Sequence, residues 1–171
     1  EKVGMKYRAQ PAGLVTGPLG PGRLNLQRDY EAYRGLTQRP KKFTLTSPYM
    51  LAKVLADDHY GSLEALVLGL ADVLKAQLTG IDADVIQVDE ANVTGHVEDG
   101  PIAAAGINRV LEGARGEKAV HLCYGNYGGQ TIQRGTYKKL IAFLNHLHAD
   151  HVVLEMARRP DHDGARPVER E

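Results

Sequence analysis

The chain is short of several residue types, and each shortage narrows what the protein can be. It contains one cysteine, no tryptophan and two phenylalanines among 171 residues. A single cysteine excludes an internal disulfide and is typical of a reducing compartment, so we expect a cytoplasmic protein. No apolar stretch is long enough to cross a bilayer, and the N-terminus has no apolar signal region, so we expect no membrane partner.

Neither sign of charge is in excess, since 21 basic residues are matched by 21 acidic ones. No large basic face follows from this balance, so nucleic acid is not an expected partner. A hydrophobic content of 43% and the length predict one domain with a substantial core. We expect that domain to cover residues 1–157. Residues 158–171 are charged and nearly devoid of apolar side chains, which predicts a solvated tail.

Strand-like and helix-like segments alternate along the chain. The patterns predict strands over 12–16, 42–46, 84–90, 118–123 and 151–155. Helices are predicted over 26–36, 48–55, 62–78, 102–114 and 136–148. The third of these helices has the clearest signals, because Ser62 is a good N-cap and Gly80 a good C-terminal stop. This alternation is typical of a parallel sheet with helical crossovers.

Polar residues gather where the predicted strands end. They are Thr16, Ser47, Asp89, Glu90, His121, Cys123 and Glu155. Active sites form at this rim in a (β/α) barrel, and an open doubly wound sheet also binds ligands beyond its strand ends. No GxGxxG motif follows the first strand, which disfavours a nucleotide-binding fold. We therefore predict an α/β fold of the (β/α) TIM-barrel type. It would be incomplete, with about five strand–helix units where a closed barrel needs about eight.

The pair His121 and Cys123 is the strongest chemical signal. Residues two apart on a strand point to one face, so an imidazole nitrogen and a thiol sulfur would project side by side. Glu155 ends the next predicted strand, where a carboxylate is costly unless it is paired or coordinated. Nitrogen, sulfur and carboxylate oxygen together suit zinc. Against this, a lone cysteine is usually a small buried hydrophobe.

Four stretches resemble the catalytic domain of cobalamin-independent methionine synthase, in the same order as in that family. They are Phe-Thr-Leu-Thr-Ser-Pro (43–48), Ile-Gln-Val-Asp-Glu (86–90), Val-His-Leu-Cys-Tyr (120–124) and Ala-Asp-His-Val-Val-Leu-Glu (149–155). The resemblance covers most of residues 40–160. Members of the family are zinc-dependent thiol methyltransferases in the same superfamily as uroporphyrinogen decarboxylase.

The resemblance implies roles for particular residues. His121, Cys123 and Glu155 would be zinc ligands, and Asp89, with Glu90 and Ser47, would contact an amino-acid thiol such as homocysteine. Zinc would lower the pKa of the bound thiol, and the thiolate would take a methyl group from a folate donor. The family's fourth zinc ligand is a cysteine on a later strand, and Cys123 is the only cysteine here. We therefore expect a partial or truncated member.

Three alternatives stay open at this point. The chain could be a catalytically silent partial barrel that acts as a binding or oligomerisation module, with a second copy closing the barrel. It could also be a zinc thiol alkyltransferase that uses another electrophile, such as an epoxide. At the level of residues, Asp89 and Glu90 could be no more than acids that start a helix. The residues identify neither the thiol nor the alkyl donor.

Overall fold

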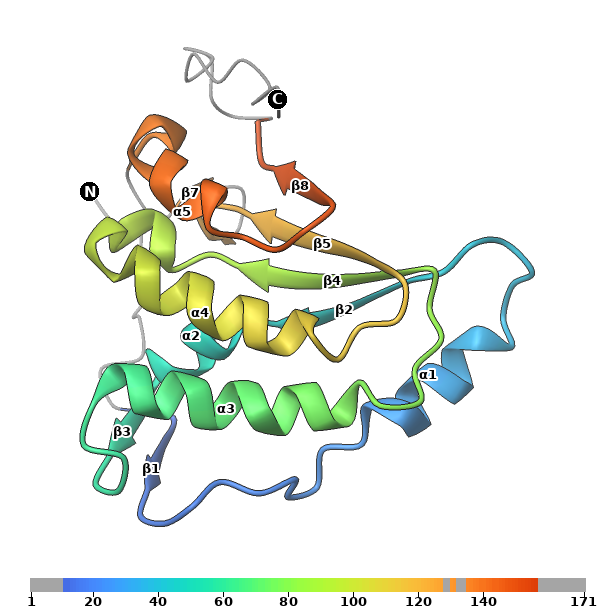
Figure 1. Ribbon diagram of the computed structural model, residues 1–171, viewed down its shortest axis with the longest axis horizontal. Helices are drawn as coiled ribbons and strands as arrows, with labels where there is room; N and C mark the ends of the chain where they lie inside the picture. The colour runs from blue at the N-terminus through green and yellow to red at the C-terminus, as the bar shows by residue number, and fades with distance from the viewer. Residues whose placement is uncertain (1–10, 128–129, 132–134, 157–171) are drawn as a thin grey trace.

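A four-stranded parallel sheet forms the centre of the computed structural model, which describes residues 11–127, 130–131 and 135–156 (Figure 1). Its strand order is β2-β4-β5-β8. The strands are β2 (Lys42–Thr46), β4 (Val85–Glu90), β5 (Glu117–Leu122) and β8 (His151–Leu154). All three neighbouring pairs are parallel, so the C-terminal ends of the four strands form one rim of the sheet. These strands match four of the five predicted ones.

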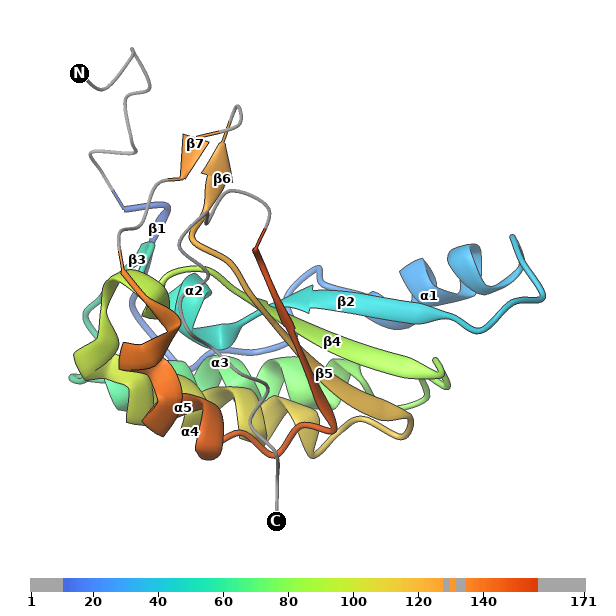
Figure 2. The same ribbon diagram turned by 90° about the horizontal axis from the view of Figure 1, so that it is seen from above.

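Helices cover one face of this sheet and leave the other bare within the described residues (Figure 2). The covering elements are α2 (Pro48–Ala52), α3 (Leu63–Gln77), α4 (Gly100–Leu111) and α5 (Ile141–Asn145). Ile86, Val88 and Val120 point to the covered face and are fully buried. The remaining helix, α1 (Leu26–Arg34), lies beside the start of β2, where Tyr30 packs edge-on against Phe43 with ring centroids 5.6 Å apart.

Helix α3 forms for the reasons read in its sequence. The Ser62 side chain accepts a hydrogen bond from the Ala65 amide at 3.1 Å, and Glu64 lies in the first turn. The buried face of the helix consists of Leu66, Val67, Ala71 and Leu74. Helix α4 packs against α3 so closely that a Cβ on Gly106 would lie 2.5 Å from Val67 Cγ1. Two of the predicted helices are thus confirmed within one to three residues at each end.

Three predictions about elements need correction. The first predicted strand, β1 (Gly13–Val15), pairs with an unpredicted strand β3 (Leu55–Asp57) in a separate two-stranded sheet. The predicted helix over 48–55 is too long at its C-terminal end, since α2 stops at Ala52 and Leu55 begins a strand that pairs with β1. The main sheet therefore has four strands rather than about five.

The predicted helix over 136–148 is shorter than expected. A 3₁₀ turn, η3 (Tyr137–Leu140), leads into α5, which ends at Asn145. The side chain of Asn108 on α4 donates to the His146 carbonyl at 2.7 Å and accepts from the His148 amide at 2.7 Å. These two bonds give the His146 carbonyl and the His148 amide partners on α4 in place of partners within α5, which ends at Asn145.

The remaining elements are small. Two 3₁₀ turns, η1 (Val93–Gly95) and η2 (Val97–Asp99), connect β4 to α4, and β6 (Asn126–Tyr127) pairs antiparallel with β7 (Gln130–Thr131). Every helix within the described residues is too short or too polar to cross a bilayer. The predicted tail over 158–171 lies outside the described residues, so the proposed domain boundary stays a prediction.

Candidate active site at the strand ends

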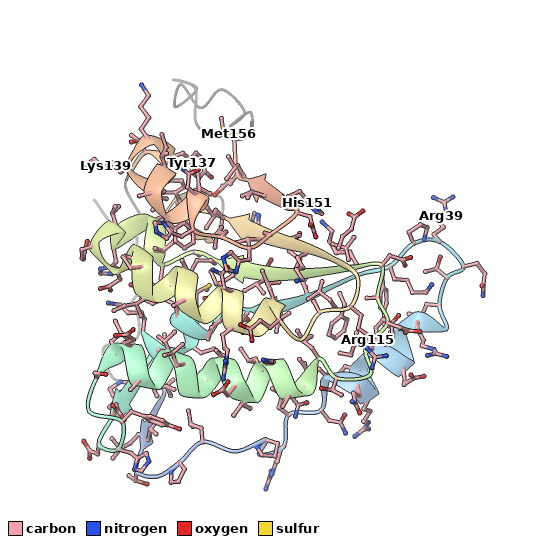
Figure 3. The ribbon with its side chains drawn as sticks, in the orientation of Figure 1. Arg39, Arg115, Tyr137, Lys139, His151 and Met156 are labelled. Carbon is pink, nitrogen blue, oxygen red and sulfur yellow. The ribbon has the colours of Figure 1, made fainter. Side chains whose placement is uncertain are left out.

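The predicted site residues lie at the C-terminal rim of the sheet. In the register of the sheet, Asp89 is beside His121 and His121 is beside Val153, so all three lie in one row across β4, β5 and β8. Cys123 and Glu155 each follow the last residue of their strand. Figure 3 shows Tyr137 toward this rim and His151 near the start of β8. The backbone therefore brings the predicted metal ligands to one face and one end of the sheet.

His121 is held in one tautomer by its neighbouring strand. Its Nδ1 lies 3.1 Å from the Val153 carbonyl oxygen. A carbonyl can only accept, so Nδ1 carries a proton, and in the neutral ring Nε2 is then the nitrogen with the lone pair. Metal-binding histidines commonly use their second ring nitrogen in this way, which fixes the ring and directs the other nitrogen to the ion.

Cys123 is half-buried in a negatively charged setting. Burial raises the pKa of its thiol, and the carboxylates of Glu155, Asp89 and Glu90 raise it further, while the Gly125 amide acts in the opposite direction. The neutral thiol is thus favoured in the absence of a cation. A divalent cation beside the sulfur would reverse this balance.

Glu155 and the end of β5 are tied together by backbone groups. The Glu155 amide donates to the Leu122 carbonyl at 3.1 Å, and a Glu155 carboxylate oxygen accepts from the Tyr124 amide at 3.1 Å. The Tyr137 hydroxyl lies 3.2 Å from the Leu122 carbonyl and 3.0 Å from the Glu155 carbonyl. Tyr137 therefore joins the ends of β5 and β8, a role that the sequence did not reveal.

Asp89 is partly exposed at the rim and oriented by a chain of polar groups. The Gln87 amide nitrogen donates to Asp89 Oδ1 at 2.7 Å, and the Lys42 ammonium donates to the Gln87 amide oxygen at 2.9 Å. Lys42 thereby fixes which way the amide of Gln87 faces. Neither Gln87 nor Lys42 was among the predicted site residues. Gln87 lies two positions before Asp89 on the same strand, so strand alternation alone could have indicated it, whereas Lys42 reaches Gln87 only through the pairing of β2 with β4.

Ser47 and Glu90 are fully buried and hydrogen-bonded to each other. The other carboxylate oxygen of Glu90 accepts from the amides of Asn92 at 2.6 Å and Val93 at 2.9 Å. Burial raises the pKa of Glu90, although these hydrogen bonds favour its ionised form. The carboxylate of Glu90 thus accepts from the two amides at which η1 begins, as the alternative of an acid at the start of a turn would have it.

The side chains of the three predicted ligands do not yet converge. Among the described residues, the group of metal-binding side chains whose ligand atoms all lie within 4.8 Å of one another is His96, Glu98 and Asp99. In that group Asp99 already accepts from the Tyr49 hydroxyl at 2.6 Å and pairs with Lys53 at 3.3 Å. His121, Cys123 and Glu155 fit zinc in chemistry, strand position and tautomer. Zinc binding would require their ligand atoms to come closer together.

The chain was compared with protein families and with curated proteins. No protein-family model matches the chain. It is 30% identical over 94 residues to a methionine synthase of Pyrococcus furiosus, and 33% identical over 101 residues to one of Thermoplasma acidophilum. Each match covers 53% of this chain, and 28% and 29% of those proteins respectively.

A solved structure gives a wider match. It is a B12-independent methionine synthase from Shewanella sp. W3-18-1 in complex with selenomethionine. The TM-score is 0.69 at 25% identity, over 81% of this chain and 44% of that one. The chain resembles part of a methionine synthase. Its fold is accordingly that of an incomplete (β/α) barrel, as predicted, and the sheet is not closed within the described residues. The chain spans less than a third of the length of the curated methionine synthases that it matches.

Proposed function

We propose that this chain is a methionine-synthase-like protein that uses zinc to activate a thiol for methyl transfer. The observation that carries the proposal is the placement of His121, Cys123 and Glu155 at the C-terminal ends of two adjacent parallel strands, with Nδ1 of His121 facing the Val153 carbonyl. The similarity to methionine synthases supports it independently. Transferase chemistry in methionine biosynthesis is the corresponding biological role.

The ligands in this proposal are the imidazole of His121, the thiolate of Cys123 and the carboxylate of Glu155. Zinc bound there would lower the pKa of a substrate thiol, so that the thiolate prevails at neutral pH. The chain's own contribution is to hold the ligands and keep Cys123 beside three carboxylates, where a cation offsets their repulsion. Zinc-bound thiolates also need a reduced Cys123, so a cytoplasmic location remains our expectation.

Asp89 is proposed to receive the ammonium group of homocysteine. Its carboxylate is partly exposed at the rim and is oriented by Gln87, so an ammonium group can reach it from solvent. Ser47 and Glu90 were predicted to contact the substrate as well. Because both are fully buried and bonded to each other, direct contact would require them to leave those partners. A folate methyl donor is proposed from the resemblance alone.

A second candidate function rests on the open edges of the sheet. Strands β2 and β8 each have one strand neighbour among the described residues, and one sheet face has no helical cover. Unpaired parallel strands favour association, and four strands are half of an eight-stranded barrel. A catalytically silent module that pairs with a second copy is therefore the alternative. A zinc alkyltransferase acting on an epoxide would share the thiol-activating half of the site.

Metal analysis of the purified protein tests the first proposal. We expect about one zinc per chain, and its loss on Cys123→Ala or His121→Ala, because each removes a ligand. His151→Ala is the matched control, since His151 lies at the opposite end of β8 and should leave zinc content unchanged. Absence of zinc, or retention after Cys123→Ala, would overturn the proposal.

A methyl-transfer assay separates the enzyme from the silent module. With homocysteine and a methyl-folate as substrates, turnover by this chain alone excludes the silent module. Zinc binding without turnover, together with a dimer in light scattering, favours the module instead.

A further inference from the structure

The buried polar side chains of the described residues are concentrated in one place. Apart from tyrosines, they are Ser47, Gln87, Glu90 and Thr94. All four lie on β4, in the turn that follows it, or at the start of α2 beside it. A buried polar group destabilises the fold unless it is hydrogen-bonded, so the partners of these four side chains show what they hold in place.

Ser47 and Glu90 fix the start of the turn after β4. The Ser47 oxygen accepts from the amides of Tyr49 at 3.1 Å and Met50 at 3.3 Å, which occupies both of its lone pairs. Its proton is therefore directed to Glu90, and Glu90 uses its other oxygen for the amides that begin η1. The turn is thus anchored to α2 through one buried side-chain pair.

The anchored turn in turn holds Cys123. This residue lies one position past β5, where regular strand pairing has ended. Its amide donates to the Glu90 carbonyl at 3.1 Å. Its carbonyl lies 3.1 Å from the Thr94 hydroxyl, which also lies 2.9 Å from the Ala91 carbonyl. The amide of Cys123 is therefore held by the last residue of β4, and its carbonyl is contacted from the turn that follows this strand.

We propose that Thr94 is a positioning residue for Cys123: its buried hydroxyl, on a turn fixed by the Ser47–Glu90 pair, sets the backbone from which the thiol projects. This inference rests on the proposed function in treating Cys123 as the reactive thiol. Thr94 touches neither substrate nor metal in this proposal. It acts by removing the freedom that a residue beyond the last strand pair would otherwise have.

The test uses Thr94→Val, which keeps the shape and removes the hydroxyl, and Thr94→Ser, which keeps the hydroxyl. Thr44→Val is the matched control, because it makes the same change at an exposed position of β2. Cys123 is the only cysteine in the chain, so the rate at which a disulfide reagent modifies the folded, metal-free protein reports on this thiol alone.

We expect Thr94→Val to raise that rate about threefold or more, because the thiol is less restrained, with Thr94→Ser and Thr44→Val within about twofold of the parent. Titration with Co²⁺ adds a spectroscopic readout, since a cobalt–thiolate absorption band appears only when sulfur coordinates. We expect Thr94→Val to weaken Co²⁺ binding about fivefold and Thr94→Ser to restore it.

Two results would overturn the inference. One is an unchanged modification rate in Thr94→Val. The other is a Thr94→Ser variant as altered as Thr94→Val, which would show that the methyl packing matters and the hydroxyl does not. If the parent protein does not bind Co²⁺ while Thr94→Val still changes the modification rate, the proposed function fails and the positioning role stands.

Discussion

The two ends of the sheet handle polar groups in opposite ways. At the C-terminal rim, Ser47, Glu90 and Thr94 are buried and bonded to backbone groups of neighbouring loops. At the other end, polar groups form ion pairs on the surface of α3 and α4, such as Arg109 with Asp72 at 2.6 Å and Lys75 with Glu112 at 2.6 Å. Buried networks specify one arrangement, whereas exposed pairs are screened by water and contribute little.

The two ends therefore differ in how firmly their polar groups are fixed. Active sites of (β/α) barrels form at the C-terminal ends of strands, whereas the opposite end serves stability. A surface groove of about 480 Å³ lies at the end of the sheet where the strands begin, and its lining includes Asp72, Lys75, Glu112 and Arg115. Exposed ion pairs line this groove, so its presence alone does not make it a binding site. The buried, hydrogen-bonded polar side chains lie at the C-terminal rim instead.

Removing the Glu90 side chain should lower the stability of the fold more than any other substitution considered below. Glu90→Ala leaves the Ser47 hydroxyl and two backbone amides without their acceptor, which is expected to lower the free energy of unfolding by about 2–3 kcal/mol. The shift in urea midpoint measures it. Glu117→Ala, at the start of β5, is the exposed control and should change stability little. Equal losses in the two variants would remove the distinction between the two ends.

Loss of the Tyr137 hydroxyl should have an intermediate effect. Tyr137→Phe keeps the edge-on contact with Tyr124, whose ring centroid lies 5.1 Å away, but removes the link between the ends of β5 and β8. We expect a loss of about 1 kcal/mol in unfolding free energy. Weaker Co²⁺ binding should accompany it, because Glu155 loses a restraint. A variant with the parent's stability and cobalt affinity would contradict this role.

A carboxylate outside the buried network provides a pH-dependent contrast. Asp57 also accepts from backbone amides, those of His59, Tyr60 and Gly61, but it is partly exposed. The Tyr60 amide is the main cause that lowers the pKa of Asp57, whereas burial raises that of Glu90. A lowered folded-state pKa gives stability that is complete above the unfolded pKa of about 4 and lost as pH falls through the folded value.

The thermal midpoint of Asp57→Asn should therefore fall below that of the parent at pH 7, and the two should approach each other at pH 3. Melting curves across this range measure the gap. A gap that stays constant with pH would mean that the charge of Asp57 is not what the turn requires.

The smallest change in stability is expected among the exposed ion pairs near the start of the strands. Arg109→Gln removes the ion pairs with Asp72 and Glu112, which are about half-exposed. Its shift in melting temperature should be smaller than that of Tyr137→Phe and should shrink further at high salt. A large loss that salt does not change would show that these exposed pairs do more than the comparison allows.

The parts of the fold that could be predicted are those with local causes. Helix α3 follows from the Ser62 cap and its apolar spacing, β4 and β8 from segments rich in valine and isoleucine, and β5 from a short apolar segment. Pairing partners are not local. The sequence therefore indicated β1 as a strand but not that it pairs with β3 outside the main sheet.

The same limit applies to the site. His121 and Cys123 are two residues apart, and a strand pattern suffices to place them on one face. Thr94 reaches Cys123 across 29 positions and Gln87 meets Lys42 across 45. Nothing local distinguishes such residues from ordinary polar ones, because their roles exist only once the strands are side by side. Ser47 and Glu90 were noticed for their place in a motif, and their burial against each other became visible only in the folded chain.

X-ray absorption on the zinc-loaded protein tests most directly the claim that the rim assembles a metal site around Cys123. The account predicts one sulfur ligand at about 2.3 Å with nitrogen and oxygen completing the shell, and loss of the sulfur signal in Cys123→Ala. A shell of nitrogen and oxygen alone, unchanged by Cys123→Ala but altered by His96→Ala, would contradict it and place the ion at His96, Glu98 and Asp99 instead.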